Sequence, residues 1–218
     1  MFLFSATKVL YYMYARKDSN LSPPNQENTY RNHHISKFFG QKLARITFYG
    51  YFCTANLKIM ERNLLIELLE DGDKVSLYSP HFEGEEYSEF EKFLLEFKDT
   101  YPDDVRQLVY RLDIIKRDGA ADRHFRYEGT RRDRVMALPS HLETTSLRLY
   151  LLNIKSKILI LGNGGLKNTA TYEEDEHLHK CVQTLQKIDI QLKQGERSRV
   201  LVVTGTQLLG QLTFTIDD

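Results

Sequence analysis

The chain reads Leu147-Arg-Leu-Tyr-Leu-Leu-Asn-Ile-Lys-Ser-Lys-Ile-Leu-Ile-Leu-Gly-Asn-Gly-Gly-Leu-Lys-Asn168 over its most regular stretch. Two runs of apolar and β-favouring residues, 147–153 and 157–161, flank the short polar break 154–156. The second run ends at a glycine-rich segment, 162–165. This pattern is typical of two buried strands joined by a tight turn. We therefore expect the central hairpin of an antiparallel sheet here, with the glycines ending its second strand.

The composition limits the class of protein. The chain has 218 residues, which is enough for one domain of ordinary size with a full hydrophobic core. No apolar run reaches the roughly 20 residues that a membrane-spanning helix needs, so we expect no membrane segment. Cys53 and Cys181 lie far apart and show no framework spacing, which favours a reducing, cytoplasmic location.

The net charge of zero hides an asymmetry between two segments. Residues 1–59 contain eight Lys and Arg against two Asp and Glu, a net charge of +6, and residues 60–218 carry −6. The first segment also holds twelve of the 25 Phe and Tyr residues of the chain and shows no sustained helical or strand periodicity.

Residues 1–59 allow three interpretations. A secretory signal is disfavoured because Lys8 interrupts the apolar run and no small-residue cleavage site follows. A basic arm that seeks an anionic partner is the second. We prefer the third, in which this segment is translated upstream DNA and the natural chain starts at Met60, since its excess of Phe, Tyr, Asn, Lys and Ile is what A/T-rich codons encode. The expected organisation is then a non-native or disordered extension (1–59), one folded domain (60–195) and a C-terminal extension (196–218).

From residue 60 on, the pattern predicts regular elements. The β-favouring runs 64–69 and 75–79 flank Asp71-Gly72, a strong hairpin signal. Apolar residues at spacings of three and four predict helices over 86–98 and 102–118, which we expect to form an αα-hairpin packed on the sheet.

The rest of the domain is predicted to add strands and a closing helix. Over 123–138 we expect a strand pair in which His124, Arg126 and Glu128 form a charged face while Phe125 and Tyr127 pack. A helix should start at residue 171 or 172 and end at Gly195. Two short β-like runs, 200–203 and 212–216, follow, and the sequence does not decide whether they join the sheet.

Two motifs near the glycines suggest a nucleotide and a zinc ion as ligands, but neither motif has the full pattern that its ligand requires. The run 162–165 with Lys167 lacks the spacing of a nucleotide-binding loop, and the acidic start of the next helix would repel phosphate. His177 and Cys181 share a predicted helix face, yet a zinc site would need further ligands from elsewhere. We expect no metal and no cofactor.

A basic segment is the more informative feature. Residues 111–134 contain eight Lys and Arg against five Asp and Glu, in a domain that is otherwise acidic. Arginine suits phosphate because its planar fork donates in pairs and stays charged. The interleaved His124 and Tyr127 would add a titratable group and a stacking ring. The alternative is a solvated strand face with ordinary surface ion pairs.

The expected order of elements resembles the RelE/ParE superfamily of bacterial toxins, most closely its phage-derived Gp49-like, HigB-type branch. The resemblance covers residues 67–194. It is carried by Arg148-Leu149-Tyr150, where the family has an arginine at a strand start, and by 157–162 and 165–169, where the family has a strand followed by Lys-Lys-Thr. Here Lys167 is followed by Asn168, so one of the paired lysines is absent, and the tail beyond residue 195 is an addition.

The resemblance implies an α+β fold and a toxin of a type II toxin–antitoxin pair. Such a toxin is an endoribonuclease that cuts mRNA on or near the ribosome without a metal, and a cognate antitoxin protein silences it. The reaction transfers a 2′-hydroxyl onto the neighbouring phosphate, which requires a base, cations and an acid. The alternative is a non-catalytic interaction protein of the same fold, either a ParE-like gyrase inhibitor or a phage-derived accessory protein.

The candidate site residues come from two sources. The resemblance implies that Arg148 stabilises the transition state and that Lys167 holds phosphate. The charged strand adds His124 and Arg126 as catalytic candidates, and the following turn adds RNA-backbone contacts from Arg131, Arg132 and Arg134.

Overall fold

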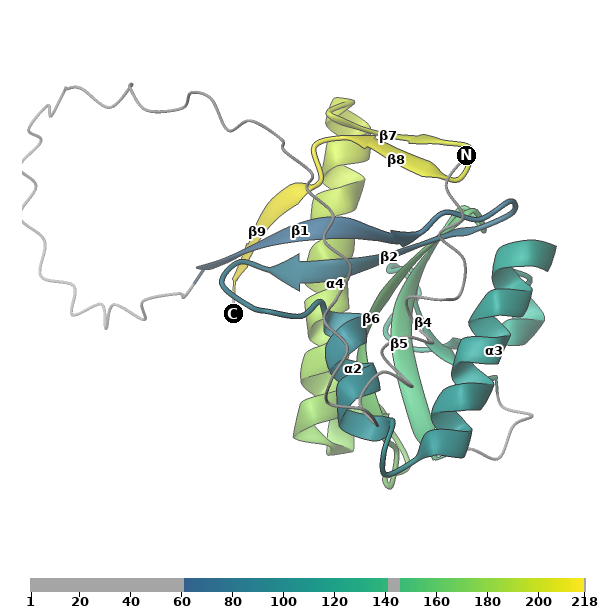
Figure 1. Cartoon of the computed structure of the whole chain (residues 1–218). Helices are drawn as coiled ribbons and strands as arrows, with labels where there is room; N and C mark the ends of the chain where they lie inside the picture. The colour runs from purple at the N-terminus through teal and green to yellow at the C-terminus, as the bar shows by residue number, and fades with distance from the viewer. Residues whose placement is uncertain (1–60, 141–145, 218) are drawn as a thin grey trace, which may run out of the picture. The chain divides into compact units, whose positions relative to one another are not determined.

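The described part of the chain has an α+β fold. A computed structural model describes residues 61–140 and 146–217, so the predictions for residues 1–59 and for a start at Met60 lie outside the described residues. Within these ranges lie a mixed seven-stranded sheet, a two-stranded sheet and three α-helices (Figure 1). None of these helices is long and apolar enough to cross a membrane.

The main sheet has the strand order β3-β4-β5-β6-β2-β1-β9. Its strands are β1 (Glu61–Glu70), β2 (Ser76–Phe82), β3 (Arg126–Tyr127), β4 (Val135–Leu138), β5 (Leu147–Ile154), β6 (Ile158–Leu166) and β9 (Thr213–Asp217). All neighbours pair antiparallel except β2 and β6, which are parallel. The predicted α+β class is confirmed, but the sheet is mixed and larger than the three or four strands expected.

The central hairpin predicted from the sequence is confirmed. Strands β5 and β6 pair antiparallel through a turn in which Lys155 and Ser156 both have positive φ, as a two-residue hairpin turn of type I′ requires. Every residue of β5 except Arg148 is buried. Its alternate side chains enter two different cores, which explains why the strand is apolar almost throughout.

The prediction that the glycines end the second strand is wrong, because β6 continues through them to Leu166. A Cβ atom on Gly164 would lie 1.9 Å from the carbonyl oxygen of Arg148, and one on Gly162 would lie 3.0 Å from the side chain of Leu185. The glycines therefore allow close approach of the neighbouring strand and helix instead of making a turn. The β5–β6 register also shifts between Leu149 and Leu151.

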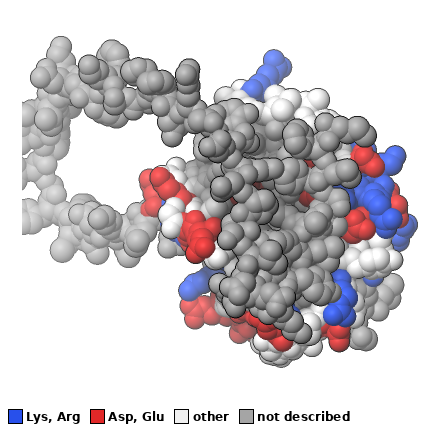
Figure 2. All heavy atoms as spheres, in the orientation of Figure 1, with Lys and Arg blue, Asp and Glu red and all other residues white. Residues whose placement is uncertain are grey.

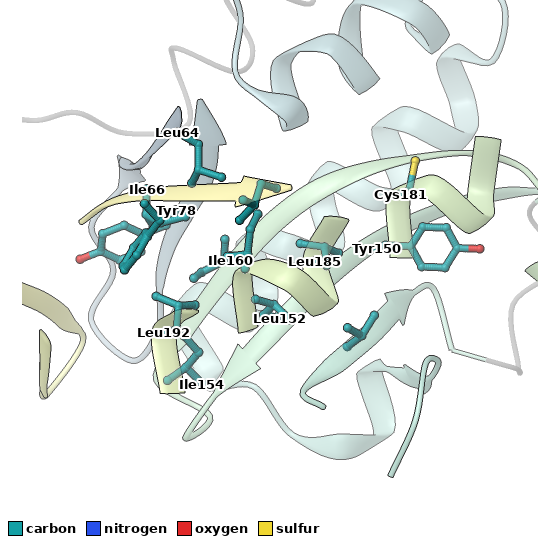
Figure 3. Close-up of a cluster of buried hydrophobic side chains, with 14 of the residues drawn as sticks. Leu64, Ile66, Tyr78, Tyr150, Leu152, Ile154, Ile160, Cys181, Leu185 and Leu192 are labelled. Carbon is teal, nitrogen blue, oxygen red and sulfur yellow. The ribbon is translucent and has the colours of Figure 1, made fainter. Parts of the chain in front are cut away.

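Helices cover both faces of the sheet (Figure 1). The predicted αα-hairpin is present as α2 (Glu89–Phe97) and α3 (Pro102–Asp118), which share one core with Leu147, Leu149 and Leu151 of β5. Ser88 caps α2 through a capping box with Glu91, and α3 begins at a proline and ends at Gly119. The longer α4 (Glu176–Ser198) forms the core on the other face, where Figure 3 shows the side chains.

The C-terminal residues belong to the fold. Helix α4 continues past Gly195, its predicted end, to Ser198, and Arg199 caps it in the left-handed conformation. Strand β7 (Leu201–Thr204) pairs with β8 (Gln207–Gly210), and β9 pairs with β1. Phe214 and Ile216 of β9 are buried in the core beneath α4. The segment 196–218 thus supplies both a small hairpin and an edge strand of the main sheet.

His81 makes a pH-dependent contribution to this fold. Its Nδ1 lies 3.0 Å from the Glu67 carboxylate and its Nε2 lies 2.9 Å from the Glu85 carbonyl oxygen. Both partners are acceptors, so both ring nitrogens carry hydrogen when both bonds are made, and this form is the imidazolium. The bond to the Glu85 carbonyl, followed by that to Glu67, raises the pKa of His81.

We expect His81→Gln to destabilise the protein at acidic pH more than at alkaline pH. Because the folded pKa is raised, the contribution of His81 is complete below its unfolded pKa of about 6.5 and is lost as the pH rises through the folded pKa. Urea unfolding at about pH 5 and about pH 9 should show a loss of less than about 1 kcal/mol that is present only at the lower value. An equal loss at both values would contradict this assignment.

Candidate functional site

A group of charged side chains replaces the aliphatic ones at one end of the sheet face that α4 covers. Arg126 pairs with Ala137 and Ala137 pairs with Tyr150, so Arg126 and Tyr150 lie in one row across three strands. Side chains alternate along a strand, so Glu128 shares the face of Arg126, and Arg148 shares that of Tyr150.

Lys167 completes this group from the neighbouring strand. Arg148 pairs with Gly165, and Lys167 follows two residues later, with its backbone N–H donating to the Ser146 carbonyl at 2.8 Å. We call the five residues the charged cluster: Arg126, Glu128, Arg148, Tyr150 and Lys167.

The cluster concentrates positive charge in a half-buried place. Arg126 Nε lies 2.7 Å from Glu128 Oε1, and the Glu128 side chain is only 7% exposed. Burial lowers the pKa of Arg148, and the charge of Arg126 lowers it further. Burial also lowers the pKa of Lys167, with added repulsion from Arg126 and Arg148. Three cations that repel one another around a single cluster carboxylate form a site that an anion would stabilise.

Tyr150 adds a hydrogen-bond donor to the cluster. Its side chain is fully buried, and its hydroxyl has no hydrogen-bond partner among the described residues. Figure 3 shows the hydroxyl pointing away from the aliphatic side chains of the core. Burial, followed by the negative charge of Glu128, raises the pKa of Tyr150, so the hydroxyl keeps its proton at neutral pH. A buried hydroxyl without a partner costs about 1–3 kcal/mol, which a ligand oxygen would recover.

Two further aromatic side chains lie in a row of ring contacts that starts at Tyr150. They are Tyr172, in the short helix η2 (Tyr172–Glu174), and His179 of α4. The rings of Tyr150 and Tyr172 meet edge to face with centroids 6.4 Å apart, and those of Tyr172 and His179 lie 6.0 Å apart. Burial and Glu173 raise the pKa of Tyr172 to about 12, so it too is neutral. Rings beside a cationic site are what an unstacked nucleobase requires.

The structure brings together three of the residues predicted from the sequence. Arg126, Arg148 and Lys167 come from β3, from β5 and from the end of β6, yet all three belong to the charged cluster.

His124 does not take the place expected of it. It lies in a short 3₁₀ helix, η1 (Asp122–His124), where it is 5% exposed and packs edge to face against Phe125. Phe125 belongs to the core of α2 and α3, so we leave His124 out of the proposed site. The expectation that Tyr127 packs is wrong: its side chain is 68% exposed, because β3 is a two-residue strand at the edge of the sheet.

The turn arginines separate into two kinds. Arg131 and Arg132 are exposed in the turn between β3 and β4 and remain predicted RNA contacts. Arg134 instead binds two carboxylates of α4, Asp189 and Glu196, and Asp189 is almost completely buried. We therefore assign Arg134 to the attachment of the turn to α4, because breaking such a buried pair is strongly destabilising.

The remaining part of the basic segment behaves as an ordinary charged surface. Lys116 pairs with Glu70, Arg117 lies 3.5 Å from Asp113, and the neighbouring Arg106 lies 2.7 Å from Asp103. Figure 2 shows basic and acidic side chains side by side on the face that it presents. The Lys116–Glu70 pair is largely buried and the other two are more exposed, and because each cation has its own carboxylate they provide no concentrated positive field.

Sequence reasoning missed two members of the charged cluster as site residues. Glu128 was expected only as part of a charged face, and Tyr150 only as part of a strand motif. One signal was available for Tyr150, which is a polar aromatic residue within an aliphatic run, two positions after Arg148. Nothing in the sequence indicates that Tyr172 and His179 reach the same place.

His177 and Cys181 form a local pair. Cys181 Sγ lies 3.7 Å from His177 Nε2, which also lies 2.9 Å from the Gly164 carbonyl oxygen. Burial raises the pKa of the Cys181 thiol to about 12, which keeps it protonated and unreactive. The described residues contain no group of three or more His, Cys, Asp or Glu side chains arranged to hold a metal.

Comparison with known proteins adds no relative. No model of a protein family, no curated protein and no solved structure matches the chain. The resemblance to the RelE/ParE superfamily therefore rests on its motifs and order of elements.

Proposed function

We propose that the protein is the toxin of a type II toxin–antitoxin pair and acts as an mRNA endoribonuclease in the cytoplasm, on or near the ribosome. The observation that carries this proposal is the charged cluster, in which Arg126 pairs with Glu128 while the paired strands β5 and β6 bring Arg148, Lys167 and the buried Tyr150 hydroxyl to the same face. This arrangement suits a phosphodiester, whose charge increases in the transition state of cleavage.

The chemistry of RNA explains why so few groups are needed. The attacking 2′-hydroxyl belongs to the substrate, so the protein has to bind phosphate, move two protons and stabilise negative charge. Arginine and lysine bind the phosphate, and the rings of Tyr172 and His179 offer a place for an unstacked base. DNA lacks the 2′-hydroxyl and is bound but not cut in this scheme.

The order of elements supports the RelE/ParE interpretation. The hairpin β1–β2, the pair α2–α3, the strands β3 to β6 and the helix α4 follow in the order of the resemblance. Strand β9 and the β7–β8 hairpin are additions to it. The cognate antitoxin is proposed as the protein partner, in keeping with this class.

Inducible expression of the full chain in a bacterial host tests the proposal. We expect growth arrest together with new 5′ ends in a reporter mRNA, in register with its codons. The variant Lys167→Met should allow growth at equal expression, because it removes one cation of the charged cluster. Arrest with intact mRNA would instead indicate a gyrase inhibitor, and normal growth with soluble, folded protein would contradict the toxin assignment.

A further inference from the structure

We propose that Glu128 is the base and Lys167 the acid of the cleavage reaction, an assignment that rests on the proposed function. Glu128 follows β3 directly and Lys167 follows β6 directly, and these strands flank β4 and β5 in the sheet. Arg148 and Tyr150 project from β5, between the two.

This order matches the geometry of the reaction. In an in-line displacement the attacking and leaving oxygens lie on opposite sides of the phosphorus. Neighbouring strands are about 4.8 Å apart, so β3 and β6 lie about 14 Å apart at the backbone. A glutamate and a lysine attached to these two strands leave room for one phosphodiester between them. Arg148 and Tyr150 of β5 would contact that phosphodiester.

The environment of Glu128 suits a base. Its carboxylate is nearly buried and is held by Arg126 at 2.7 Å, while its backbone N–H donates to the Val135 carbonyl at 3.3 Å. Its negative charge acts on the pKa of Arg148, of Tyr150 and of Lys167. It is the one carboxylate of the charged cluster, and an ionised carboxylate is an acceptor that can take a proton.

The environment of Lys167 suits an acid. Its side chain is half-buried and makes no ion pair with the described residues. Burial, Arg126 and Arg148 favour loss of its proton, because they lower its pKa from that of a surface lysine. A lysine that gives up its proton more readily than a surface lysine suits proton transfer to a developing alkoxide.

Glu128 takes the proton of the 2′-hydroxyl, O2′ forms a bond to phosphorus, the bond from phosphorus to O5′ breaks, and Lys167 gives its proton to O5′. The products are a 2′,3′-cyclic phosphate and a 5′-hydroxyl. Arg126 and Arg148 stabilise the pentacoordinate phosphorane, and Tyr150 donates to one of its non-bridging oxygens. Water then returns the proton from Glu128 to Lys167.

A sulfur atom in place of O5′ separates the acid from the base. The substrate is a reporter mRNA that carries one 5′-bridging phosphorothiolate at a mapped cleavage site, assayed with and without ribosomes. A thiolate leaves without protonation, so the acid becomes dispensable. We expect Lys167→Met to cut ordinary RNA about 10³-fold more slowly than the wild type, and to cut the sulfur substrate within about tenfold of it. Glu128→Gln should be slow on both substrates.

Matched variants at exposed sites control for charge and folding. Lys74→Met and Glu176→Gln lie outside the charged cluster and should cut both substrates at the wild-type rate. Equal impairment of Lys167→Met on the two substrates would overturn the acid, and wild-type cleavage of ordinary RNA by Glu128→Gln would overturn the base. Failure of the wild-type chain to cut any RNA, with or without ribosomes, would instead overturn the proposed function itself.

Discussion

Arg148→Ala in the full chain is expected to lower the rate of RNA cleavage by about 10³-fold while the protein stays folded. The guanidinium lies within the charged cluster, where it would face the phosphate between Glu128 and Lys167. Loss of a donor to the transition state slows the chemical step. The loss of stability should be small beside the loss of rate, because burial and repulsion from Arg126 disfavour the charge of Arg148 and offset its hydrogen bond to the Leu147 carbonyl oxygen at 2.9 Å. Single-turnover cleavage and thermal unfolding measure the two effects separately.

Arg148→Lys distinguishes charge from geometry. Lysine keeps the positive charge but lacks the planar fork that donates two parallel hydrogen bonds to phosphate. We expect an intermediate rate, and partial recovery of Arg148→Ala when guanidinium is added to the reaction. A folded Arg148→Ala chain that cuts at the wild-type rate would remove Arg148 from the reaction and leave it a purely structural residue.

The sequence predicted those elements whose signals are local. The central hairpin, the αα-hairpin and the start of α3 at Pro102 each follow from periodicity or from a capping residue within a few positions. The parallel pairing of β2 with β6 and the return of β9 to β1 could not be predicted. Both join segments far apart in the chain, and neither leaves a local pattern.

The residues of the candidate site likewise separate into those with a local signal in the sequence and those placed by distant parts of the chain. Arg148 was predicted from the RelE/ParE resemblance and Arg126 from the alternation of charged residues in its strand, and the structure places both in the charged cluster. The sequence could not separate Arg134 from its neighbours Arg131 and Arg132, because the difference lies in Asp189 and Glu196, two carboxylates more than 50 positions away on α4. Tyr172 contacts Tyr150, and His179 contacts Tyr172, only because η2 and the start of α4 return to this end of the sheet.

Gly164→Ala is expected to lower the free energy of unfolding by about 3–5 kcal/mol, the largest stability effect that we predict. The added Cβ would lie 1.9 Å from the carbonyl oxygen of Arg148, 2.9 Å from its carbonyl carbon and 3.0 Å from the Cα of Leu149. All three atoms are backbone, so no change of side-chain rotamer relieves the clash. Strands β5 and β6 have to separate at the point where Arg148 enters the charged cluster.

Gly165→Ala is the matched control, one position along the same strand. Its added Cβ would lie 3.1 Å from Leu178 and 3.3 Å from His177, in both cases a side-chain atom that can shift by a few tenths of an ångström. We expect this variant to lose less than about 1.5 kcal/mol in urea unfolding. Equal stability of the two variants would mean that β5 and β6 are not held this closely at Gly164. If the close pairing also positions Arg148, cleavage by the surviving folded fraction of Gly164→Ala should fall further than its population, whereas Gly165→Ala should lose activity only in proportion to its folded fraction.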